Sequence, residues 1–299
     1  MEYCNNANNW PIVGSLIDAS GTVGTPGGIA NASWSAPGSW IDSDMLTVGC
    51  NNSPPRRGSP CAGTNGKPLT PVEERSQFTM WCLFASNLML GSNVSAMTPS
   101  TLAIVSNVEA LAINRDPLGD HGVLAYDSGS SLGGANISCL GTGALMAGND
   151  LLVKNMTFAA ARSFCLANSS CAGFTAAAGC DETKLKGGAV VQVFFKHALN
   201  TRNTDKKWST WGKTMPRFQV FVKKMADPKT RAVAVLNRGP TTLDAQLNWT
   251  MLRPGDPTGD LKVRDIWAHS DKGIFNGGYL VKGLKSHAAA LFLVTEFSL

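Results

Sequence analysis

The sequence has few of the features that mark membrane or nucleic-acid-binding proteins. Only 16% of its 299 residues are charged, and no apolar run approaches the roughly 18 residues that cross a bilayer as a helix. The first residues, Met1–Asn6, lack the basic start and apolar segment of a signal peptide. No zinc finger, RNA-binding signature or dense Lys/Arg block is present. We therefore expect no membrane-spanning helix and no nucleic-acid partner.

Metal and nucleotide motifs are also lacking. No two cysteines have the CxxC spacing of a structural zinc site. The four histidines, His121, His197, His269 and His287, show no metal-binding spacing. The Gly/Ser runs lack the strand–turn–helix context of a P-loop or a nucleophile elbow. These patterns support neither a structural metal site nor a nucleotide site.

The charges that are present are unevenly distributed along the chain. The overall net charge is +5, but residues 1–125 carry a net charge of −4 and residues 126–299 a net charge of +9. We interpret the basic half as a solvated surface, because its cations are spread out along the chain. Hydrophobic residues make up 43% of the chain, which is enough for a packed core and for two domains.

Cysteines and glycosylation sequons point to the secretory route. The eight cysteines are an even number, and seven Asn-X-Ser/Thr sequons occur, at Asn31, Asn51, Asn93, Asn136, Asn155, Asn168 and Asn248. Together they predict a secreted or lysosomal/vacuolar glycoprotein with disulfides. The absence of a signal peptide conflicts with this composition. One explanation is that the chain is a fragment that lacks its natural N-terminus, and the sequence does not decide between truncation and a natural start at Met1.

Two cysteine pairs have suggestive spacings. Cys50 and Cys61 bracket a polar, proline-containing insertion, as expected for a disulfide that closes a surface loop. Cys165 and Cys171 lie in one short helix–loop segment, where a bond between them is geometrically awkward. We expect this pair to bond outward instead, with Cys139 and Cys180 as the alternatives.

The first half of the chain shows two helix starts. Residues 1–68 read as irregular, apart from a strand end or loop at Met45–Gly49. A helix is predicted from Thr70, with Pro71 at its first position and Glu73 completing a capping box, and Gly91 is expected to end it. A second helix is predicted from Thr98-Pro99. The apolar residues of 108–113 predict a short buried strand, and Asp116–Gly119 a turn.

The second half reads as a small module followed by β structure. Residues 127–150 are rich in Gly and Ser, as in a linker. In the module at 151–213, Thr157 is expected to cap a short helix and Val190–Lys196 to form a strand. From residue 217 onward, short alternating segments separated by Gly and Pro turns predict an antiparallel sandwich.

Four segments resemble a known family in the same order. Pro37–Gly49 resembles the Pro-Gly-x-Trp-Asn-Asp-Pro-Asp-Met-Leu segment of glycoside hydrolase family 27, the α-galactosidases and α-N-acetylgalactosaminidases. Asn107–Gly119 resembles the family's Asn-x-Glu-Val-Ile-Ala-Ile-Asn-Gln-Asp-Pro-Leu-Gly segment. Val233–Arg238 and Val263–Trp267 resemble two strands of its β domain. The resemblance covers residues 37–126 and 213–299.

The resemblance implies a (β/α)₈ TIM barrel followed by an antiparallel β domain. A complete barrel takes about 250 residues, and only about 125 precede the β region here, so the expected fold class is the C-terminal part of a barrel followed by a β-sandwich. The implied domains are a partial barrel at 1–125, a β domain at 126–150 and 214–299, and an insertion at 151–213. The insertion weakly resembles a PAN/apple-type module, which binds proteins or carbohydrates.

The resemblance also implies a chemistry and site residues. The family retains anomeric configuration with two carboxylates, a nucleophile and an acid/base. The family's Lys-x-Asp nucleophile segment has no counterpart in this chain. In one alignment, its Trp-Arg-x-x-x-Asp acid/base segment corresponds to Trp10–Ser15, which lacks the acid, so Asp18 is the candidate for a shifted acid/base. In the other, Tyr3–Asn6 corresponds to an earlier barrel strand and the acid/base segment is deleted. Trp40, Asp42 and Asp44 are the candidate substrate-binding residues, although structural roles in their loop are equally consistent with the sequence.

Two functions follow from these expectations. The first is α-galactosidase activity in the complete protein, namely retaining hydrolysis of terminal α-galactosides in oligosaccharides or glycoconjugates, with this chain itself weakly active or inactive. The second is a catalytically inactive glycan-binding or interaction protein built on the same fold. The sequence does not separate galactose from N-acetylgalactosamine and does not give the oligomeric state.

Overall fold

The computed structural model describes residues 10–21, 36–50, 69–128, 136–145, 150–168, 171–177, 188–197, 203, 205–214 and 217–297. The chain divides into two compact units. The first unit comprises residues 1–128 and 217–299, and the second comprises residues 129–216. Among the described residues, no helix is both long and apolar enough to cross a membrane.

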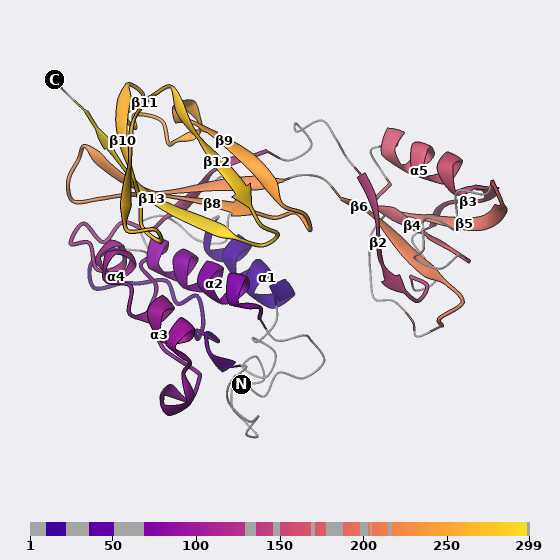
Figure 1. The fold of residues 1–299 in the computed structure, drawn as a ribbon, viewed down its shortest axis with the longest axis horizontal. Coiled ribbons are helices and arrows are strands. Elements are labelled where there is room, and N and C mark those ends of the chain that lie inside the picture. Colours follow the sequence, from indigo (N-terminus) through magenta and orange to yellow (C-terminus); the bar gives the residue numbers. More distant parts are fainter. Residues whose placement is uncertain are drawn as a thin grey trace. The chain divides into compact units, whose positions relative to one another are not determined.

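The first unit is a helical segment that packs on antiparallel β-sheets (Figure 1). Its helices are α1 (Trp10–Gly21), α2 (Pro71–Leu83), the 3₁₀ helix η4 (Val94–Ala96), α3 (Pro99–Val105) and α4 (Val108–Asn114). A six-stranded sheet has the order β1 (Val123–Asp127), β7 (Phe218–Lys224), β8 (Thr230–Asn237), β13 (Ala289–Glu296), β10 (Asp260–Asp265) and β11 (Ser270–Asn276). A second sheet pairs β12 (Gly278–Leu284) with β9 (Leu243–Asn248), and η6 (Trp249–Met251) follows β9.

The central strands of the six-stranded sheet are covered on both faces. Every residue of β8 is buried, and β8 pairs with β7 and β13 in antiparallel register. One face contributes Ala234, Leu236 and Leu291 to a core shared with Met80 and Leu83 of α2. The sandwich predicted from residue 217 onward is therefore present as antiparallel strands, with helices on one face of the larger sheet.

The helix starts of the first half are where the sequence places them. Thr70 caps α2, and its capping box with Glu73 is complete. Thr98 caps α3, with Pro99 at the first helical position. In α2, every residue from Glu73 to Leu83 except Arg75 is buried, as expected of a helix enclosed on several sides.

Three predictions for the first half are wrong. Residues 10–21 form α1, whereas the sequence predicts irregular structure there. Helix α2 ends at Leu83 rather than near Gly91, because the chain must reverse at Ala85 (φ 53°) to bring Leu90 beside Leu46. Residues 108–114 form α4 rather than a strand, since the Asn107 side chain accepts hydrogen bonds from the backbone amides of Glu109 and Ala110.

The bridge between Leu46 and Leu90 is parallel. The Leu46 amide donates to the Met89 carbonyl, and the Gly91 amide donates to the Leu46 carbonyl, each at 2.8 Å. Helix α2 lies between the two bridged segments in sequence. This is the arrangement of a β–α–β crossover in which each of the two strands is represented by one bridged residue.

The second unit is a five-stranded antiparallel sheet with one helix (Figure 1). The strand order is β2 (Asn136–Thr142), β6 (Ser209–Thr214), β4 (Gly173–Ala176), β5 (Val190–Lys196) and β3 (Asp150–Thr157). Helix α5 (Phe158–Ala167) begins after its predicted cap, Thr157, and β5 is the predicted strand. Its own core includes Phe174, Phe195 and Trp211.

Two predictions for the second half need correction. Residues 136–142 were assigned to the linker and the C-terminal β domain, but β2 pairs with β6 within the second unit. Cys165 and Cys171, expected to bond outward, are joined to each other, because Cys171 follows the end of α5 closely enough to bring the two Cα atoms within 5.3 Å. Cys50 and Cys139 each take part in a disulfide as well. Cys61 and Cys180 lie outside the described residues.

Candidate functional site

The segment 36–50 carries three of the four predicted site residues. It opens with a tight turn in which Ala36 and Ser39 exchange backbone hydrogen bonds of 2.8 Å around Pro37-Gly38. Trp40 follows directly and is 41% exposed. Gly119, at φ +65°, lies against Trp40, and a Cβ atom there would be 2.8 Å from the tip of the indole. The two turns therefore fix the Trp40 ring between them.

Asp42 and Asp44 organise the backbone of this segment. Asp42 Oδ1 accepts from the Asp44 amide at 2.9 Å, and Asp44 Oδ1 accepts from the Met45 amide at 2.7 Å. Asp44 itself adopts a positive φ of 73°, which Asp tolerates better than most residues. Its carbonyl accepts a hydrogen bond of 2.7 Å from Trp81 Nε1. Both carboxylates thus order the backbone of their own loop, and the Asp44 carbonyl attaches the loop to α2; this is the structural role left open by the sequence.

Helix α2 anchors the following residues through buried polar side chains. Gln77 Oε1 accepts from the amide and the hydroxyl of Thr47, at 3.0 and 3.1 Å. Glu74 Oε1 accepts from the Gly49 amide at 2.9 Å. Burial raises the pKa of Glu74, and the Gly49 hydrogen bond offsets only part of this effect. The strand end at Leu46 is thereby fixed to the helix that follows it.

A cavity of about 520 Å³ lies beside Trp40. Its wall comes from three places in the chain, namely the turn at Pro37, the segment after α2, and the end of α4 with the turn that follows it. The lining residues are Pro37, Trp40, Ala85, Ser86, Asn87, Leu88, Leu111, Asn114, Arg115, Asp116 and Pro117. Trp40 is the one predicted substrate-binding residue in this lining, since Asp42 and Asp44 are not part of it.

Polar groups at this cavity are partly committed to the fold. Asn114 Nδ2 donates to the carbonyls of Ser86 and Trp81, at 3.0 and 3.4 Å. Asp116 Oδ1 accepts from the amides of Leu118 and Ala226, at 3.1 and 2.9 Å, which confirms the predicted turn. The indole of Trp40 and the amide of Asn87 remain as groups that a bound molecule can reach.

The candidate acid/base, Asp18, lies on α1 away from this lining. Its Oδ2 accepts a hydrogen bond of 2.7 Å from Nη2 of Arg238, and its side chain is 50% exposed. Two residues further along the helix, Ser20 hydrogen-bonds to Ser43, which in turn bonds to Ser86. Helix α1 therefore contacts the loop of Asp42 and Asp44 through Ser20, whereas the Asp18 carboxylate is bound by Arg238 of the β domain.

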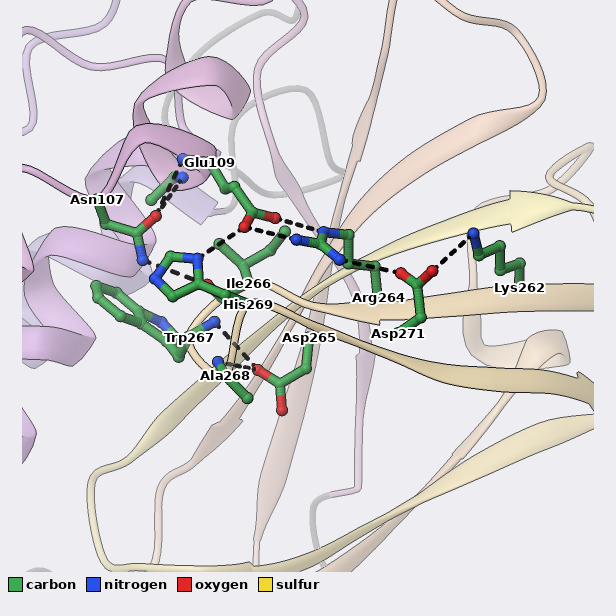
Figure 2. Close-up of polar contacts among 11 residues, drawn as sticks. Asn107, Glu109, Lys262, Arg264, Asp265, Ile266, Trp267, Ala268, His269 and Asp271 are labelled. Carbon is green, nitrogen blue, oxygen red and sulfur yellow. Dashed lines mark hydrogen bonds and ion pairs between the residues drawn. The ribbon is translucent and has the colours of Figure 1, made fainter.

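A second polar cluster joins two of the four family-like segments, 107–119 and 263–267 (Figure 2). Glu109 of α4 accepts hydrogen bonds from Nε and Nη2 of Arg264 on β10, at 2.6 and 2.8 Å. His269 Nδ1 lies 2.7 Å from Oε1 of the same carboxylate, the oxygen that also accepts from Arg264 Nη2. Arg264 also contacts Asp271, which pairs with Lys262. The cluster connects the end of the helical segment to the β10–β11 hairpin.

The charges in this cluster reinforce one another. The pKa of Glu109 is lowered mainly by its hydrogen bonds to Arg264. Burial acts in the opposite direction and raises this pKa, whereas the hydrogen bond to His269 lowers it further. The same contacts raise the pKa of Arg264. A glutamate held this firmly in its charged form serves as an anchor rather than as a proton carrier. Sequence reasoning singled out both motifs without pairing Glu109 with Arg264, although their opposite charges were the available signal.

The loop after β10 completes this junction. Asp265 Oδ1 accepts from the amides of Trp267 and Ala268, at 3.1 and 3.0 Å. The Asn107 side chain, which caps α4, donates to the Ile266 carbonyl at 3.3 Å (Figure 2). Within the described parts of the chain, no group of three or more His, Cys, Asp or Glu side chains has the arrangement of a metal site.

Comparison with known proteins relates part of the chain to α-galactosidases. Residues 216–294 match the family described as the alpha galactosidase C-terminal beta sandwich domain. Alpha-galactosidase 3 of Arabidopsis thaliana is 35% identical over 117 residues, which cover 38% of this chain and 23% of that protein. An alpha-galactosidase of Oryza sativa subsp. japonica is 35% identical over 118 residues, 38% of this chain and 24% of that protein.

Solved structures show the same fold at lower identity. A Bacteroides fragilis protein, provisionally described as an alpha-galactosidase/melibiase, has a TM-score of 0.54 and 20% identity, over 95% of this chain and 38% of that chain. A β-L-arabinopyranosidase of glycoside hydrolase family 27 from Geobacillus stearothermophilus has a TM-score of 0.52 and 17% identity, over 96% of this chain and 42% of that chain.

These matches have a limited extent. The chain spans about a quarter of the length of the two curated relatives. The family match begins at residue 216 and gives no support to a PAN/apple-type module at 151–213. What is established is that the C-terminal β-sandwich, with part of the helical region before it, is related to alpha-galactosidases.

Proposed function

We propose that this chain forms the C-terminal part of a retaining glycoside hydrolase of family 27 that acts on terminal α-galactosides. Residues 36–126 would supply the last strands and helices of a (β/α)₈ barrel, and residues 217–297 its β-sandwich. The observation that carries the proposal is the parallel Leu46–Leu90 bridge, with α2 as its crossover helix, on a sandwich related to alpha-galactosidases. A barrel is built from such parallel β–α–β steps.

The reaction needs two carboxylates about 5 to 5.5 Å apart and no cofactor. Asp18 is our candidate for the acid/base, and in that role its ion pair with Arg238 would have to open so that the carboxyl could protonate the leaving oxygen. Trp40 is the candidate sugar contact, since it borders a cavity and is fixed by two turns. Asp42 and Asp44 would act through the shape of the loop that carries Trp40.

A specific observation favours the alternative, a catalytically inactive glycan-binding protein. The carboxylates of Asp42 and Asp44 bond to the amides of their own loop, while Trp40 is exposed beside a cavity that the exposed Asn87 also lines. An indole with a neighbouring amide can bind a sugar without cleaving it. In either case the partner we propose is an oligosaccharide or glycoconjugate with terminal α-galactose.

A secreted or lysosomal/vacuolar location is part of the same proposal. The Cys165–Cys171 disulfide and the disulfide-bonded Cys50 and Cys139 support an oxidising compartment. The sequon at Asn155 lies on an exposed position of β3, where a glycan can be attached without disturbing the core.

The test is a hydrolysis assay on the full chain, produced in a secretory host. The substrates are the p-nitrophenyl α-D-galactoside, α-N-acetylgalactosaminide and β-L-arabinopyranoside. If the proposal holds, the chain cleaves the α-galactoside only weakly, because it has no counterpart of the family's nucleophile segment, and Asp18→Asn lowers that residual kcat by at least about 100-fold, the contribution of a general acid. Asp150→Asn, in the second unit, is the matched control and should leave kcat unchanged.

Binding separates the two functions. Galactose binding without hydrolysis, abolished by Trp40→Ala and retained in Asp18→Asn, would replace the hydrolase proposal with the glycan-binding one. Hydrolysis that persists in Asp18→Asn would remove Asp18 from the mechanism. A folded chain that neither cleaves nor binds any of these sugars would contradict both functions.

A further inference from the structure

A larger cavity, of about 820 Å³, lies on the β-sandwich and the start of α2. Its floor includes Val281, Ala290 and Phe292, from strands of the two sheets. Arg75 of α2 forms part of one side. The lining of the Trp40 cavity shares no residue with this one. Its volume is in the range of cavities that bind small organic molecules.

The rim of this cavity is strongly cationic. Arg75, Lys272, Lys282 and Lys285 line it, whereas Asp265 is the one acidic residue in the lining. Lys272 is paired with Asp265 at 3.3 Å. Arg75, Lys282 and Lys285 have no carboxylate partner in the part of the chain that the structure describes. Three cations without a carboxylate partner therefore line a single cavity, which favours an anionic ligand.

Aromatic side chains form the wall beneath these cations. Trp267 is oriented by a hydrogen bond of 3.0 Å from its Nε1 to Thr79 Oγ1, and the Arg75 guanidinium lies 5.6 Å from its ring centroid. Phe275 and Tyr279 contact each other edge to face, with centroids 4.9 Å apart. The hydroxyl of Tyr279 makes no hydrogen bond with the described residues and remains free to bind a ligand.

We propose that this cavity binds a saccharide that carries an anionic group, either a carboxylate or a sulfate ester. Arg75, Lys282 and Lys285 would bind the anion, since charge-assisted hydrogen bonds are the strongest that these side chains make. The rings of Trp267 and Tyr279 would cover the apolar face of a pyranose, and the Tyr279 hydroxyl would bond to a sugar hydroxyl. Neutral sugars lack the group that the cationic rim requires.

This inference does not depend on the hydrolysis proposal. The cavity includes none of the candidate catalytic or substrate-binding residues, so the ligand would be held while the Trp40 site is empty or occupied. The combination of rings, one free hydroxyl and unpaired cations distinguishes the saccharide from an acidic peptide, which offers charge without a flat pyranose face. An acidic peptide is therefore used as a probe in the test.

The test measures binding to the full chain by titration calorimetry at low salt. The probes are an unsulfated uronic-acid disaccharide, its sulfated form, neutral lactose and triglutamate. We expect at least one anionic disaccharide to bind at least tenfold more tightly than lactose and triglutamate. Lys282→Ala/Lys285→Ala should weaken that binding about tenfold or more, and Tyr279→Phe should weaken it severalfold without changing the charge.

A charge-matched control uses exposed lysines of the second unit. Lys206→Ala/Lys207→Ala removes the same two charges outside the cavity and should leave binding unchanged. Binding to only the carboxylated or only the sulfated disaccharide supports the proposal and identifies the anion. Equal binding of triglutamate, or an equal loss in the control variant, would overturn it, as would the absence of any binding by the anionic disaccharides.

Discussion

A lysine lies in the middle of the first unit's core. Lys223 of β7 is fully buried, and its Nζ donates a hydrogen bond of 2.7 Å to the carbonyl of Ile113, in the last turn of α4. Burial lowers its pKa to about 8, although Asp116 and Asp120 partly oppose this effect. A cation at the end of a helix is favourable, but its desolvation is costly. Lys223 therefore connects α4 to the sheet at the expense of stability whenever it is charged.

The pH dependence of stability follows from this lowered pKa. Between pH 8 and about 10.4, the ordinary lysine value, the unfolded chain binds more protons at this site than the folded chain does, so the free energy of unfolding should rise with pH. Lys223→Met removes this contribution. We expect the stability of the natural chain relative to this variant to increase by roughly 2 kcal/mol over that interval.

Urea denaturation at pH 7.5, 9 and 10.5 measures this difference. Lys229→Met, at an exposed turn position, is the control and should show no such change relative to the natural chain. A constant difference between Lys223→Met and the natural chain across all three pH values would mean that Lys223 keeps its proton in the folded state.

At the scale of elements, α2 depends on the β domain as well as on its own cap. Ser76, which is buried, donates to the carbonyl of His287 at 2.7 Å and accepts from the amide of Ala289 at 2.8 Å. In addition, His287 Nδ1 lies 2.6 Å from Oε1 of Glu73, the glutamate of the α2 capping box. One turn of α2 thus satisfies the backbone at the start of β13.

Removing the Ser76 hydroxyl should destabilise this contact. Ser76→Ala leaves the Ala289 amide buried without an acceptor, so we expect a loss of about 1–3 kcal/mol in the free energy of unfolding. Ser106→Ala is the matched control, because Ser106 is exposed and bonds within its own helix, and its effect should stay within about 0.5 kcal/mol. Equal effects of the two substitutions in urea denaturation would argue against a role for Ser76 in docking α2.

The elements that could be predicted are those whose signals are local. Thr70, Thr98 and Thr157 each start a helix because their side chains cap the first turn, a property that the sequence displays directly. The end of α2 depends on the bridge between Leu90 and the distant Leu46, and the residues near Leu83 carry no helix-ending signal. Helix α4 was misread as a strand because its buried Ala110 and Ile113 sit in a short apolar run that fits both periods.

The candidate site was less predictable than the fold. Trp40, which the sequence predicts as a substrate contact, borders a cavity, but the other lining residues besides Pro37 come from Ala85–Leu88 and Leu111–Pro117, which the chain brings together only after α2 and α4 have packed. The pair Glu109–Arg264 joins positions 155 residues apart in the sequence. Sequence motifs identify such residues individually, whereas the ion pair between them forms only in the tertiary structure.

At the scale of the whole molecule, the two units have separate cores. The first is built from helices and the six-stranded sheet, and the second from α5 and its five-stranded sheet. Cys165 and Cys171 lie in the core of the second unit, where their disulfide ties the end of α5 to the start of β4. Separate cores allow each unit to unfold in its own cooperative transition.

Removal of this disulfide should therefore act on one transition alone. The bond closes a short loop, with a sequence separation of 6, so Cys165→Ala/Cys171→Ala should destabilise the second unit by about 2 kcal/mol through loop entropy. We expect calorimetry of the natural chain to show two transitions, and the variant to lower only one. Hydrogen exchange of β5 and β8 amides assigns each transition to a unit, because both are interior strands, hydrogen-bonded on both sides, one in each sheet. A single transition that shifts as a whole would mean that the two cores fold as one cooperative system.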